Sequence, residues 1–378
     1  MSKEPTVPAR PKIPDYFYVV PIGNDRLQFR AGPRVVRLGG KAVSQLFPKL
    51  LPLLNGRYQV SEITSELKEF KEETILAALT ILRKKGLLED ASAMPSFDLS
   101  PQELKRYDRH FSFFSHFNDD RYEYQGILKS AKVAVLGLGQ VGAQVLSSLA
   151  ACGIGEIRVA GDGVVEGRDL GSFYTEAEIG KTKREAAQLS VSKINPHVQV
   201  ESVEGKVSSV EDAMDLIDGA DLVIVCVDGP SISIFRWVNE ACLTKKIRWT
   251  SASLNGNEAI IGPSIVPFET ACYTCYELRR KANETFYEEY LAFEKYMEDN
   301  PDLVREYGSI PSLSEMVGGY VALEAIKILT DVTFPVTCGR ICTVNFLSLE
   351  TDVEEVLKLP YCPTCSQAKP KPKLWLEE

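Results

Sequence analysis

The sequence lacks any hydrophobic run long enough to cross a membrane. Spanning a bilayer takes about 20 consecutive apolar residues, and no stretch of the 378-residue chain comes near that length. The N-terminal stretch MSKEPTVPARPKIPDY is polar and proline-containing, without the apolar segment of a secretory signal peptide. We therefore expect a cytoplasmic protein with no membrane partner.

The chain also lacks an excess of basic residues. Lysine and arginine total 43 against 52 aspartate and glutamate residues, which gives a formal net charge of −9. A protein that binds along a phosphate backbone needs a surplus of positive charge, so we expect no nucleic-acid partner. The apolar fraction of 44% and the charged fraction of 25% are typical of a soluble globular protein.

The cysteine pattern is not that of a disulfide scaffold. Nine cysteines in a large acidic chain differ from the short cysteine-dense pattern of secreted domains. Cys152, Cys226 and Cys242 occur singly within the apolar patterns LAACGI, VIVCVD and NEACLT. We expect these three side chains to be small buried hydrophobic groups.

The length allows two or three domains. Residues 1–15 are expected to form a flexible arm. Residues 16–90 contain short strand candidates separated by GND and AGP turns, then three helical patterns, and this order predicts a small winged-helix-like α+β domain. Residues 91–105 are expected to be a linker, residues 106–366 a larger domain, and residues 367–378 a tail.

The larger domain has the pattern of an α/β fold. KVAVLGLG, QVGAQVLSSLAACG and EIRVAG predict strand, helix and strand, and DLVIVCVD predicts a further buried strand. Apolar strands alternating with amphipathic helices indicate a mainly parallel, Rossmann-like sheet. The charged and aromatic segment 276–311 is expected to be a helical insertion.

A glycine-rich turn joins the first strand to the first helix of this domain. Gly137, Gly139 and Gly142 form G-x-G-x-x-G, in which glycine lets the backbone approach a phosphate at the helix N-terminus. The flanking strand and helix favour nucleotide binding over a turn that binds nothing. The motif alone does not choose between NAD, FAD and ATP.

Two cysteine knuckles lie far apart in the chain. CYTC supplies Cys272 and Cys275, and YCPTC supplies Cys362 and Cys365. Two C-x-x-C pairs in a cytosolic chain predict a four-thiolate tetrahedral zinc site. Because the protein would fill all four positions, we expect the zinc to be structural and to hold the C-terminal segment to the sheet domain.

These motifs in this order resemble the ThiF/MoeB superfamily, the ubiquitin-activating-enzyme-like adenylyltransferases. The resemblance rests on the glycine-rich turn of ATP type, GKTKREA, VIVCVDGPSISIFRWVN and the paired C-x-x-C motifs, and it covers roughly residues 106–365. It is greatest to the branch that matures ribosomally synthesised peptide natural products (RiPPs). That branch carries a small N-terminal winged-helix domain that holds the leader of a precursor peptide, and residues 16–90 fit it.

The resemblance implies roles for three charged residues in the adenylation of a substrate by ATP and magnesium. Arg109, in RYDRH with Arg106, would reach toward the phosphates, usually across a homodimer. Lys183, with Lys181 nearby, would neutralise the triphosphate, and Asp228 would hold magnesium. Each role suits attack on ATP, because the phosphates need positive charge and a metal.

The chain departs from the family pattern at the second strand of the nucleotide site. The family has an acid at the strand end and a second acid two residues later, whereas this chain has Gly161 and Gly163, with Asp162 between them on the opposite face. Asp162 could contact a ribose only if a bulge re-aimed it. Asp169 and Ser172 stand where the family has asparagine and arginine. By the resemblance, we expect the ribose-binding acid and one phosphate-binding arginine to be lost.

Two functions from different classes follow, and the resemblance supplies both. In the first, the chain is an adaptor that binds a leader peptide and serves a partner YcaO-type cyclodehydratase in thiazole and oxazole formation. In the second, it is an ATP-dependent enzyme that adenylates a peptide, like the microcin-forming and pantocin-forming members. Sulfur-carrier adenylation is a third reading, which the N-terminal domain disfavours. Ubiquitin-type thioester chemistry is not expected, because no cysteine lies between Tyr276 and Thr337.

The altered nucleotide strand favours the adaptor. Its leader peptide would add as a strand to a sheet edge in the LQFRAGPRVVRL region, with the third helix of the small domain closing the groove. The expected peptide-binding residues are Leu27, Phe29, Val35, Val36, Leu38, Ile75, Leu79 and Leu82.

Overall fold

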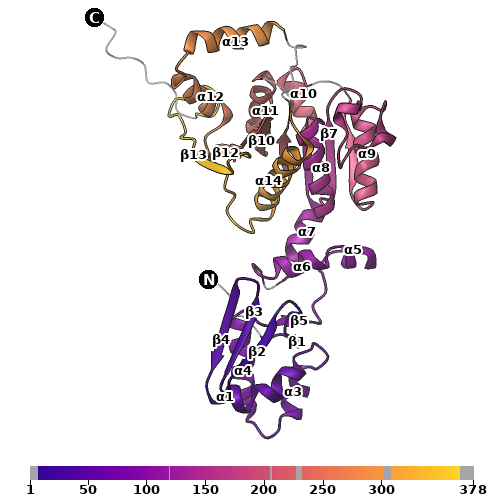
Figure 1. Cartoon of the computed structure of the whole chain (residues 1–378), viewed down its shortest axis with the longest axis vertical. Helices are drawn as coiled ribbons and strands as arrows, with labels where there is room; N and C mark the ends of the chain where they lie inside the picture. The colour runs from indigo at the N-terminus through magenta and orange to yellow at the C-terminus, as the bar shows by residue number, and fades with distance from the viewer. Residues whose placement is uncertain (1–6, 119, 205–206, 227–231, 301–307, 367–378) are drawn as a thin grey trace, which may run out of the picture. The chain divides into compact units, whose positions relative to one another are not determined.

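The computed structural model describes residues 7–118, 120–204, 207–226, 232–300 and 308–366, and the chain divides into two compact units at residues 126 and 127 (Figure 1). The elements of the first unit follow in chain order. They are β1 (Pro11–Lys12), β2 (Tyr18–Ile22), β3 (Arg26–Ala31), β4 (Arg34–Gly39), α1 (Lys41–Gln45), α2 (Phe47–Leu50), the 3-10 helix η1 (Leu51–Leu53), α3 (Val60–Glu66), α4 (Glu72–Lys84), β5 (Glu89–Asp90), α5 (Pro101–Arg106), α6 (Asp108–Phe114) and the start of α7 (Glu123–Ser130).

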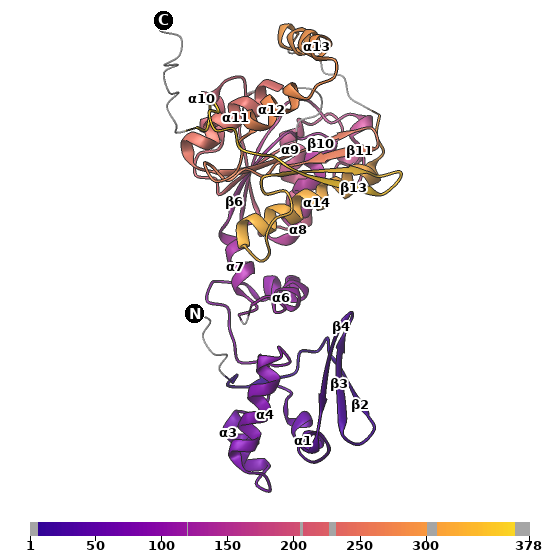
Figure 2. The ribbon, with the colours of Figure 1, turned by 90° about the vertical axis from the view of Figure 1, so that its left-hand side faces the viewer.

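Strands β2, β3 and β4 form an antiparallel sheet in which β3 is central. The β3–β4 hairpin turns through the two residues Gly32 and Pro33, and Gly32 has a φ of 56°, which is costly for a residue with a Cβ. Helices α3 and α4 lie on one side of the three strands (Figure 2). The sheet therefore has one face packed on a core and one face open.

The core of the first unit forms between that sheet and the helices. Side chains alternate along a strand, so Leu27 and Phe29 of β3 point inward and are buried. Helix α4 buries Ile75, Leu79 and Leu82, which recur at helical spacing. The inward faces of β3 and α4 are thus used by the core itself.

The expected N-terminal arm is ordered from residue 7. β1 pairs antiparallel with β5, with Pro11 opposite Asp90. The Asp90 carboxylate accepts hydrogen bonds from the backbone N–H groups of Ala9 and Arg10. This pairing fixes residues 9–12 to the end of the small domain.

The expected linker also packs inside the first unit. Phe97 and Leu104 contact a buried cluster formed by Tyr107, Phe111 and Tyr122. Residues 91–126 therefore belong to the first unit, and the boundary lies some twenty residues beyond the predicted one at 105 and 106. Aromatic burial is the physical reason for the difference.

The second unit contains the α/β sheet that the sequence predicts. Its elements are β6 (Lys132–Leu136), α8 (Gln140–Cys152), β7 (Glu156–Ala160), the 3-10 helices η2 (Gly167–Asp169) and η3 (Glu176–Glu178), α9 (Lys183–Ile194), β8 (Gln199–Ser202), α10 (Val210–Leu216), β9 (Leu222–Val225), α11 (Ile232–Lys245), β10 (Arg248–Asn255), β11 (Glu258–Ile261), α12 (Tyr273–Ala282), α13 (Tyr287–Asp299), α14 (Pro311–Thr330), β12 (Arg340–Asn345) and β13 (Glu350–Glu355).

The eight strands of this sheet run in the order β13-β12-β11-β10-β9-β6-β7-β8. Strands β10, β9, β6, β7 and β8 are parallel neighbours, and β11, β12 and β13 extend the sheet with antiparallel pairs. Helices α10, α11 and α12 cover one face, while α8 and α14 lie on the other (Figure 2). The predicted Rossmann-like fold is confirmed, and the glycine-rich turn lies at the carboxyl end of the central strand β6.

Strand β13 forms one edge of the large sheet and is exposed at every residue. It carries Glu350, Asp352, Glu354 and Glu355 among its six residues. Charge on an edge strand opposes pairing with the edge of another sheet. No helix among the described residues is both long enough and apolar enough to span a membrane.

The division of α4 into core and surface positions gives a stability prediction. Leu79 is fully buried, whereas Ile81 on the same helix is 48% exposed. Leu79→Ala should lower the free energy of unfolding by about 2–5 kcal/mol because it removes core contacts and leaves a cavity. Ile81→Ala should change it by about 0.5 kcal/mol or less.

Urea-dependent hydrogen exchange of peptides from β3 and α4 measures both values on the full chain. Equal effects of the two substitutions would contradict the assignment of Leu79 to the core.

Candidate functional site

The glycine-rich turn of the second unit has the close backbone approach of a phosphate-binding turn. Gly137 has a φ of 96°, and Gly139 precedes the first residue of α8. A Cβ on Gly142 would lie 1.9 Å from the carbonyl oxygen of Gly137. Only glycine allows α8 to start this close to β6, and the free N–H groups at the helix start can receive an anion.

The end of β7 does not offer the expected ribose acid. A Cβ on Gly161 would lie 2.9 Å from Cγ and 3.1 Å from the backbone nitrogen of Leu138. An aspartate or glutamate at residue 161 would therefore require Leu138 to move. Gly161 therefore lies in close contact with the glycine-rich turn.

Asp162 is held by a neighbouring arginine. Its Oδ1 lies 3.2 Å from Nη1 of Arg184, and the same guanidinium donates to the Gly161 carbonyl over 3.3 Å. β7 ends at Ala160, so no bulge within the strand turns Asp162 toward the glycine-rich turn. The Asp162 carboxylate therefore already has an ion-pair partner in Arg184.

Lys183 begins α9 and makes an ion pair with Asp169. The Lys183 Nζ lies 2.7 Å from the Asp169 Oδ1, and the side chains are only 12% and 9% exposed. Asp169 stands where the family pattern has a neutral asparagine. A phosphate that binds Lys183 must compete with a carboxylate that is already present and shielded from water.

The residue in place of the family's phosphate arginine is also engaged. The Ser172 hydroxyl donates to the side-chain oxygen of Gln144 on α8 over 3.1 Å. Tyr174 donates its hydroxyl to the Leu138 carbonyl. These bonds fix residues 172–174 against the glycine-rich turn without a ligand.

Two expected catalytic residues are not part of this described cluster. Arg109 is exposed on α6, in the first unit. Asp228, the expected magnesium ligand, lies outside the described residues. The structure thus brings together Gly137, Gly139, Gly142 and Lys183, and it adds Asp169 as a partner that the motif reading did not assign to Lys183.

The two cysteine knuckles meet, as the spacing predicts. Cys272 directly precedes α12 and Cys275 lies in its first turn, while Cys362 and Cys365 come from the loop after β13. The four sulfur atoms lie within 4.8 Å of one another, and all four side chains are buried. Sulfur–sulfur distances of 3.6, 3.7 and 3.9 Å match the edges of a ZnS₄ tetrahedron, about 3.8 Å for a Zn–S bond of about 2.3 Å.

The thiols show why a cation suits this cluster. Burial raises the pKa of Cys272 to about 11. Burial also acts to raise the pKa of Cys362, but N–H groups of Cys365 and Thr364 and the nearby thiols outweigh it and lower that pKa. A bound Zn²⁺ would compensate four thiolates in an otherwise apolar surrounding of Leu243, Ala271 and Leu359.

The expected peptide-binding residues divide between core and surface. The structure places Leu27, Phe29, Ile75, Leu79 and Leu82 in the core, where they cannot line an open groove. Val36 and Leu38 of β4 pack against that core while staying half-buried, and Val35 is exposed. The open surface of this region is therefore the edge and the outer face of β4.

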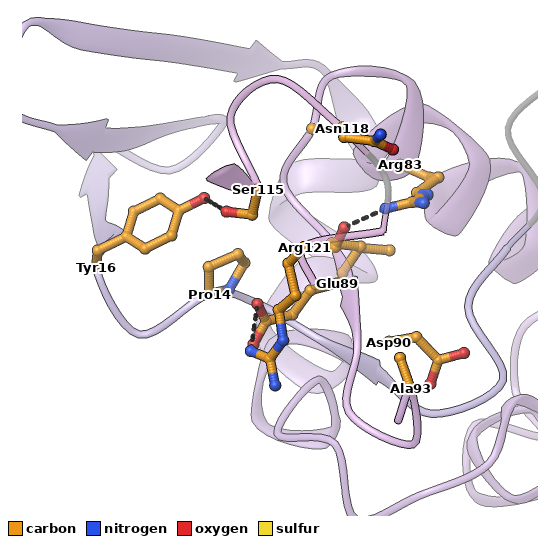
Figure 3. Close-up of a pocket in the computed structure, with 11 residues that line it drawn as sticks. Pro14, Tyr16, Arg83, Glu89, Asp90, Ala93, Ser115, Asn118 and Arg121 are labelled. Atoms are coloured by element: carbon orange, nitrogen blue, oxygen red, sulfur yellow. Dashed lines mark hydrogen bonds and ion pairs between the residues drawn. The ribbon is translucent and has the colours of Figure 1, made fainter. Parts of the chain in front are cut away.

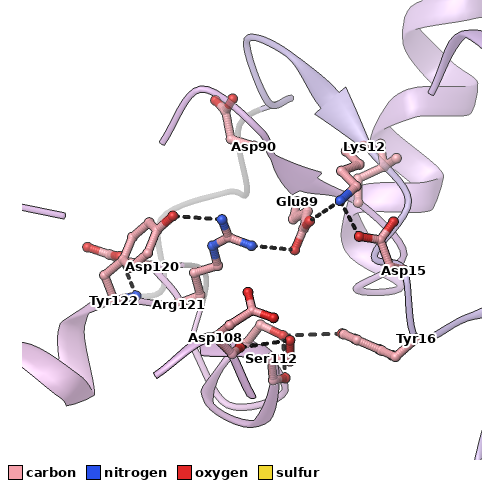
Figure 4. Close-up of polar contacts among 12 residues, drawn as sticks. Lys12, Asp15, Tyr16, Glu89, Asp90, Asp108, Ser112, Asp120, Arg121 and Tyr122 are labelled. Atoms are coloured by element: carbon pink, nitrogen blue, oxygen red, sulfur yellow. Dashed lines mark hydrogen bonds and ion pairs between the residues drawn. The ribbon is translucent and has the colours of Figure 1, made fainter. Parts of the chain in front are cut away.

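Sequence patterns gave no signal for a polar pocket in the first unit (Figure 3). The Glu89 carboxylate makes two ion pairs (Figure 4). Its Oε1 lies 3.7 Å from Lys12 Nζ, and its Oε2 lies 3.3 Å from Arg121 Nη1. Arg121 also donates to the Tyr122 hydroxyl over 2.6 Å. Burial acts to lower the pKa of Arg121, but Tyr122 and Glu89 outweigh it and raise that pKa.

Hydrogen bonds around this pocket hold separate segments of the first unit together. The Tyr16 hydroxyl lies 3.2 Å from that of Ser115, and Arg83 donates to the Leu88 carbonyl (Figure 3). The Tyr16–Ser115 contact and the Glu89–Arg121 ion pair join the small domain to residues 115–122. The residues that line the pocket are scattered along the sequence from Pro14 to Arg121, so no local spacing could reveal it.

Comparison with known proteins places the second unit in one family. Residues 107–366 match the ThiF family. The molybdopterin-synthase adenylyltransferase of Salmonella typhimurium is 27% identical over 273 residues, which span 71% of this chain and 99% of that protein.

Solved structures resemble both units of the chain. Escherichia coli MccB in complex with AMPCPP and MccA has a TM-score of 0.72 at 19% identity, covering 94% of this chain and 99% of MccB. PaaA has a TM-score of 0.71 at 20% identity, covering 91% of this chain and 100% of PaaA. At these identities the likeness establishes the fold.

The cysteine cluster gives a metal prediction. The purified protein should contain about one zinc per chain, and Cys362→Ser should remove most of it because one of four thiolate ligands is lost. Zinc affinity should fall as the pH falls, since protons compete for thiols such as Cys272. Elemental analysis and a chelator competition at several pH values measure both effects.

Cys342→Ser provides the control, because Cys342 is buried outside the cluster. Absence of zinc from the wild-type protein, or equal loss in the two variants, would refute the site.

The Lys183–Asp169 pair gives a nucleotide prediction. Asp169→Asn should strengthen binding of ATP·Mg by about tenfold, or about 1.4 kcal/mol, because it frees Lys183 and removes a charge that repels phosphate. Isothermal titration calorimetry measures the change. Glu176→Gln, which neutralises an exposed acid of η3, should leave ATP affinity within about twofold of the wild type.

Unchanged ATP affinity in Asp169→Asn would show that the ion pair does not limit nucleotide binding.

Proposed function

Because the chain belongs to the ThiF family, we propose that it is a maturation protein for ribosomally synthesised peptides that binds the leader of a precursor peptide through its first unit. The second unit, in this proposal, presents the bound peptide to a YcaO-type cyclodehydratase. The protein works in the cytoplasm as a homodimer, with a structural zinc at the four cysteines.

The open edge of β4 carries the proposal. β4 is an outer strand of the three-stranded sheet. A two-residue hairpin closes on a hydrogen-bonded pair, here Ala31 and Arg34, and hydrogen-bonded pairs alternate from there. The backbone groups of Val35, Arg37 and Gly39 therefore point away from β3 and can pair with an extended peptide.

The opposite edge of the sheet is less suitable. β2 carries Pro21, which has no N–H to donate. By the same alternation, Pro21 lies at a position whose backbone points away from β3. Of the two outer strands, β4 alone has a donor at every residue.

The solved relatives support a polypeptide ligand. MccB was crystallised with MccA, and its likeness to this chain extends over 94% of the sequence, which includes most of the first unit. The likeness concerns the fold, so the transfer of a peptide ligand to this chain is part of the proposal.

The nucleotide site supports binding without adenylation. Asp162 and Lys183, two of the charged residues expected near ATP, are paired with Arg184 and Asp169. Charged side chains that are already paired within the protein contribute little binding free energy to a triphosphate. In this proposal the domain keeps its fold and has lost tight ATP binding.

A peptide-adenylating enzyme is the second candidate. The glycine-rich turn is intact, and Lys183 still stands at the start of α9. In that case Lys183 would exchange Asp169 for the phosphates, Arg109 would reach the phosphates from α6, and Asp228 would hold magnesium. A sulfur-carrier adenylyltransferase would need the same residues, and it gives no role to the first unit.

Substitution at Val35 tests the peptide edge. Val35→Pro removes a backbone donor that points away from β3, so it should weaken peptide binding by at least about tenfold. Val35→Ala shortens the side chain and keeps the donor, so it should stay within about threefold of the wild type. Fluorescence anisotropy with a labelled peptide, selected from a displayed random library on the wild-type chain, measures both.

Equal affinities of the Pro and Ala variants would exclude strand addition at β4. Pyrophosphate release from ATP that depends on the selected peptide would favour the adenylating enzyme over the adaptor.

A further inference from the structure

We propose that the outer face of the three-stranded sheet recognises acidic side chains of the peptide strand that joins β4. Arg30 and Arg37 receive the carboxylates. The inference rests on the proposed strand addition and specifies its ligand as a peptide in which acidic and aliphatic residues alternate.

The outer face is the one opposite the core, and its side chains are known from the strand register. Arg30 of β3 lies between Tyr18 of β2 and Val35 of β4, and Arg37 is opposite Gln28. Tyr18 is 75% exposed and Val35 is 38% exposed. No helix among the described residues of the first unit covers this face (Figure 2), so it is a surface of apolar side chains and guanidinium groups.

The guanidinium groups are concentrated on this face. Arg30 and Arg37 are diagonal neighbours across β3 and β4, and Arg26, opposite Gly39, extends the same row. Diagonal positions on one face are about 7–8 Å apart between Cα atoms, which is within reach of long side chains. Three positive charges therefore share one small surface of a chain whose net charge is −9.

These charges are weakly compensated by the protein. Arg26 has a single ion pair, with the adjacent Asp25 at 3.8 Å. Arg30 and Arg37 have no ion pair among the residues that the structure describes. Like charges placed close together without counter-charges repel, and an acidic ligand would relieve that repulsion.

Protection of the sheet edge does not account for this pattern. Arginine or lysine on an outer strand discourages unwanted pairing, and Arg37 of β4 fits that role. Arg26 and Arg30, however, belong to the central strand β3, which has no free edge. Their position suits recognition across the face.

Strand addition aligns the peptide with both faces of β4. Successive side chains of a strand point to opposite faces. One set of peptide side chains would then lie beside Val36 and Leu38, which pack on the core. The alternate set would lie beside Val35 and Arg37. Arg30 is on the next strand, β3, about 5 Å beyond β4.

The two faces of β4 therefore select different residue types at alternate peptide positions. The inner face favours aliphatic residues, because Val36 and Leu38 are apolar and half-buried. The outer face favours aspartate or glutamate, because charge-assisted hydrogen bonds to arginine are strong and directional. The ligand class is an extended peptide with acidic residues at every second position.

Selection from a displayed random-peptide library on the full chain tests this pattern. The wild type should enrich peptides with Asp or Glu at alternate positions and aliphatic residues between them. The double variant Arg30→Glu, Arg37→Glu should lose that acidic enrichment or replace it with Lys and Arg, while it keeps the aliphatic positions. Both arginines are exposed, so the variant should fold.

A labelled peptide enriched on the wild type then gives the affinities. Its dissociation constant should rise at least about tenfold in the double variant. In the wild type it should also rise as ionic strength increases from about 0.05 to 0.5 M, since exposed charges are screened. The control Lys68→Glu, Lys71→Glu makes the same charge change on the helical side and should stay within about twofold.

The outcomes test the acidic ligand and the strand addition separately. Enriched peptides without acidic bias, or equal affinity in the arginine variant, would overturn the acidic ligand, even where Val35→Pro still abolishes binding. Enriched peptides that bind Val35→Pro as tightly as the wild type would overturn strand addition, and the acidic-strand inference with it.

Discussion

The glycine-rich turn after β6 sets the close packing on which the second unit depends. Gly142 lets the carbonyl of Gly137 approach where a Cβ would sit, so α8 can start directly above the central strand. The same turn brings Leu138 against Gly161 at the end of β7. One set of close backbone contacts fixes β6, β7 and α8 together. The turn thus has an architectural role that does not depend on a bound nucleotide.

Charge pairing follows from that packing. With no acid at residue 161, Asp162 and Lys183 find partners within the protein, in Arg184 and Asp169. A phosphate site that binds strongly presents unpaired positive charge, and this site presents pairs. The first unit shows the opposite arrangement, because Arg30 and Arg37 on its outer sheet face have no carboxylate partner within the described parts of the chain. In our proposal the second unit is a stable scaffold, and the first unit supplies a charged recognition surface.

Local spacing predicted the parts of this structure that depend on local chemistry. The strand–turn–helix pattern predicted β6 and α8, and the C-x-x-C pairs predicted the meeting of Cys272, Cys275, Cys362 and Cys365. Helical spacing also found the apolar face of α4. It could not tell whether that face meets a core or a ligand, because Phe29 and the other side chains that cover it lie in distant segments. The same limit hid the packing of Phe97 on Tyr107, and the pairing of Lys183 with Asp169 fourteen residues away.

The acidic strand β13 bears on how an extended peptide would choose among sheet edges. Every open edge offers unpaired backbone groups, and those groups carry no sequence information. β4 presents its edge beside arginines, and β13 presents its edge beside Glu350, Asp352 and Glu354. A peptide rich in carboxylates is attracted to the first edge and repelled by the second. For such a peptide, the opposite charge of these two edges would favour pairing with β4 over pairing with β13.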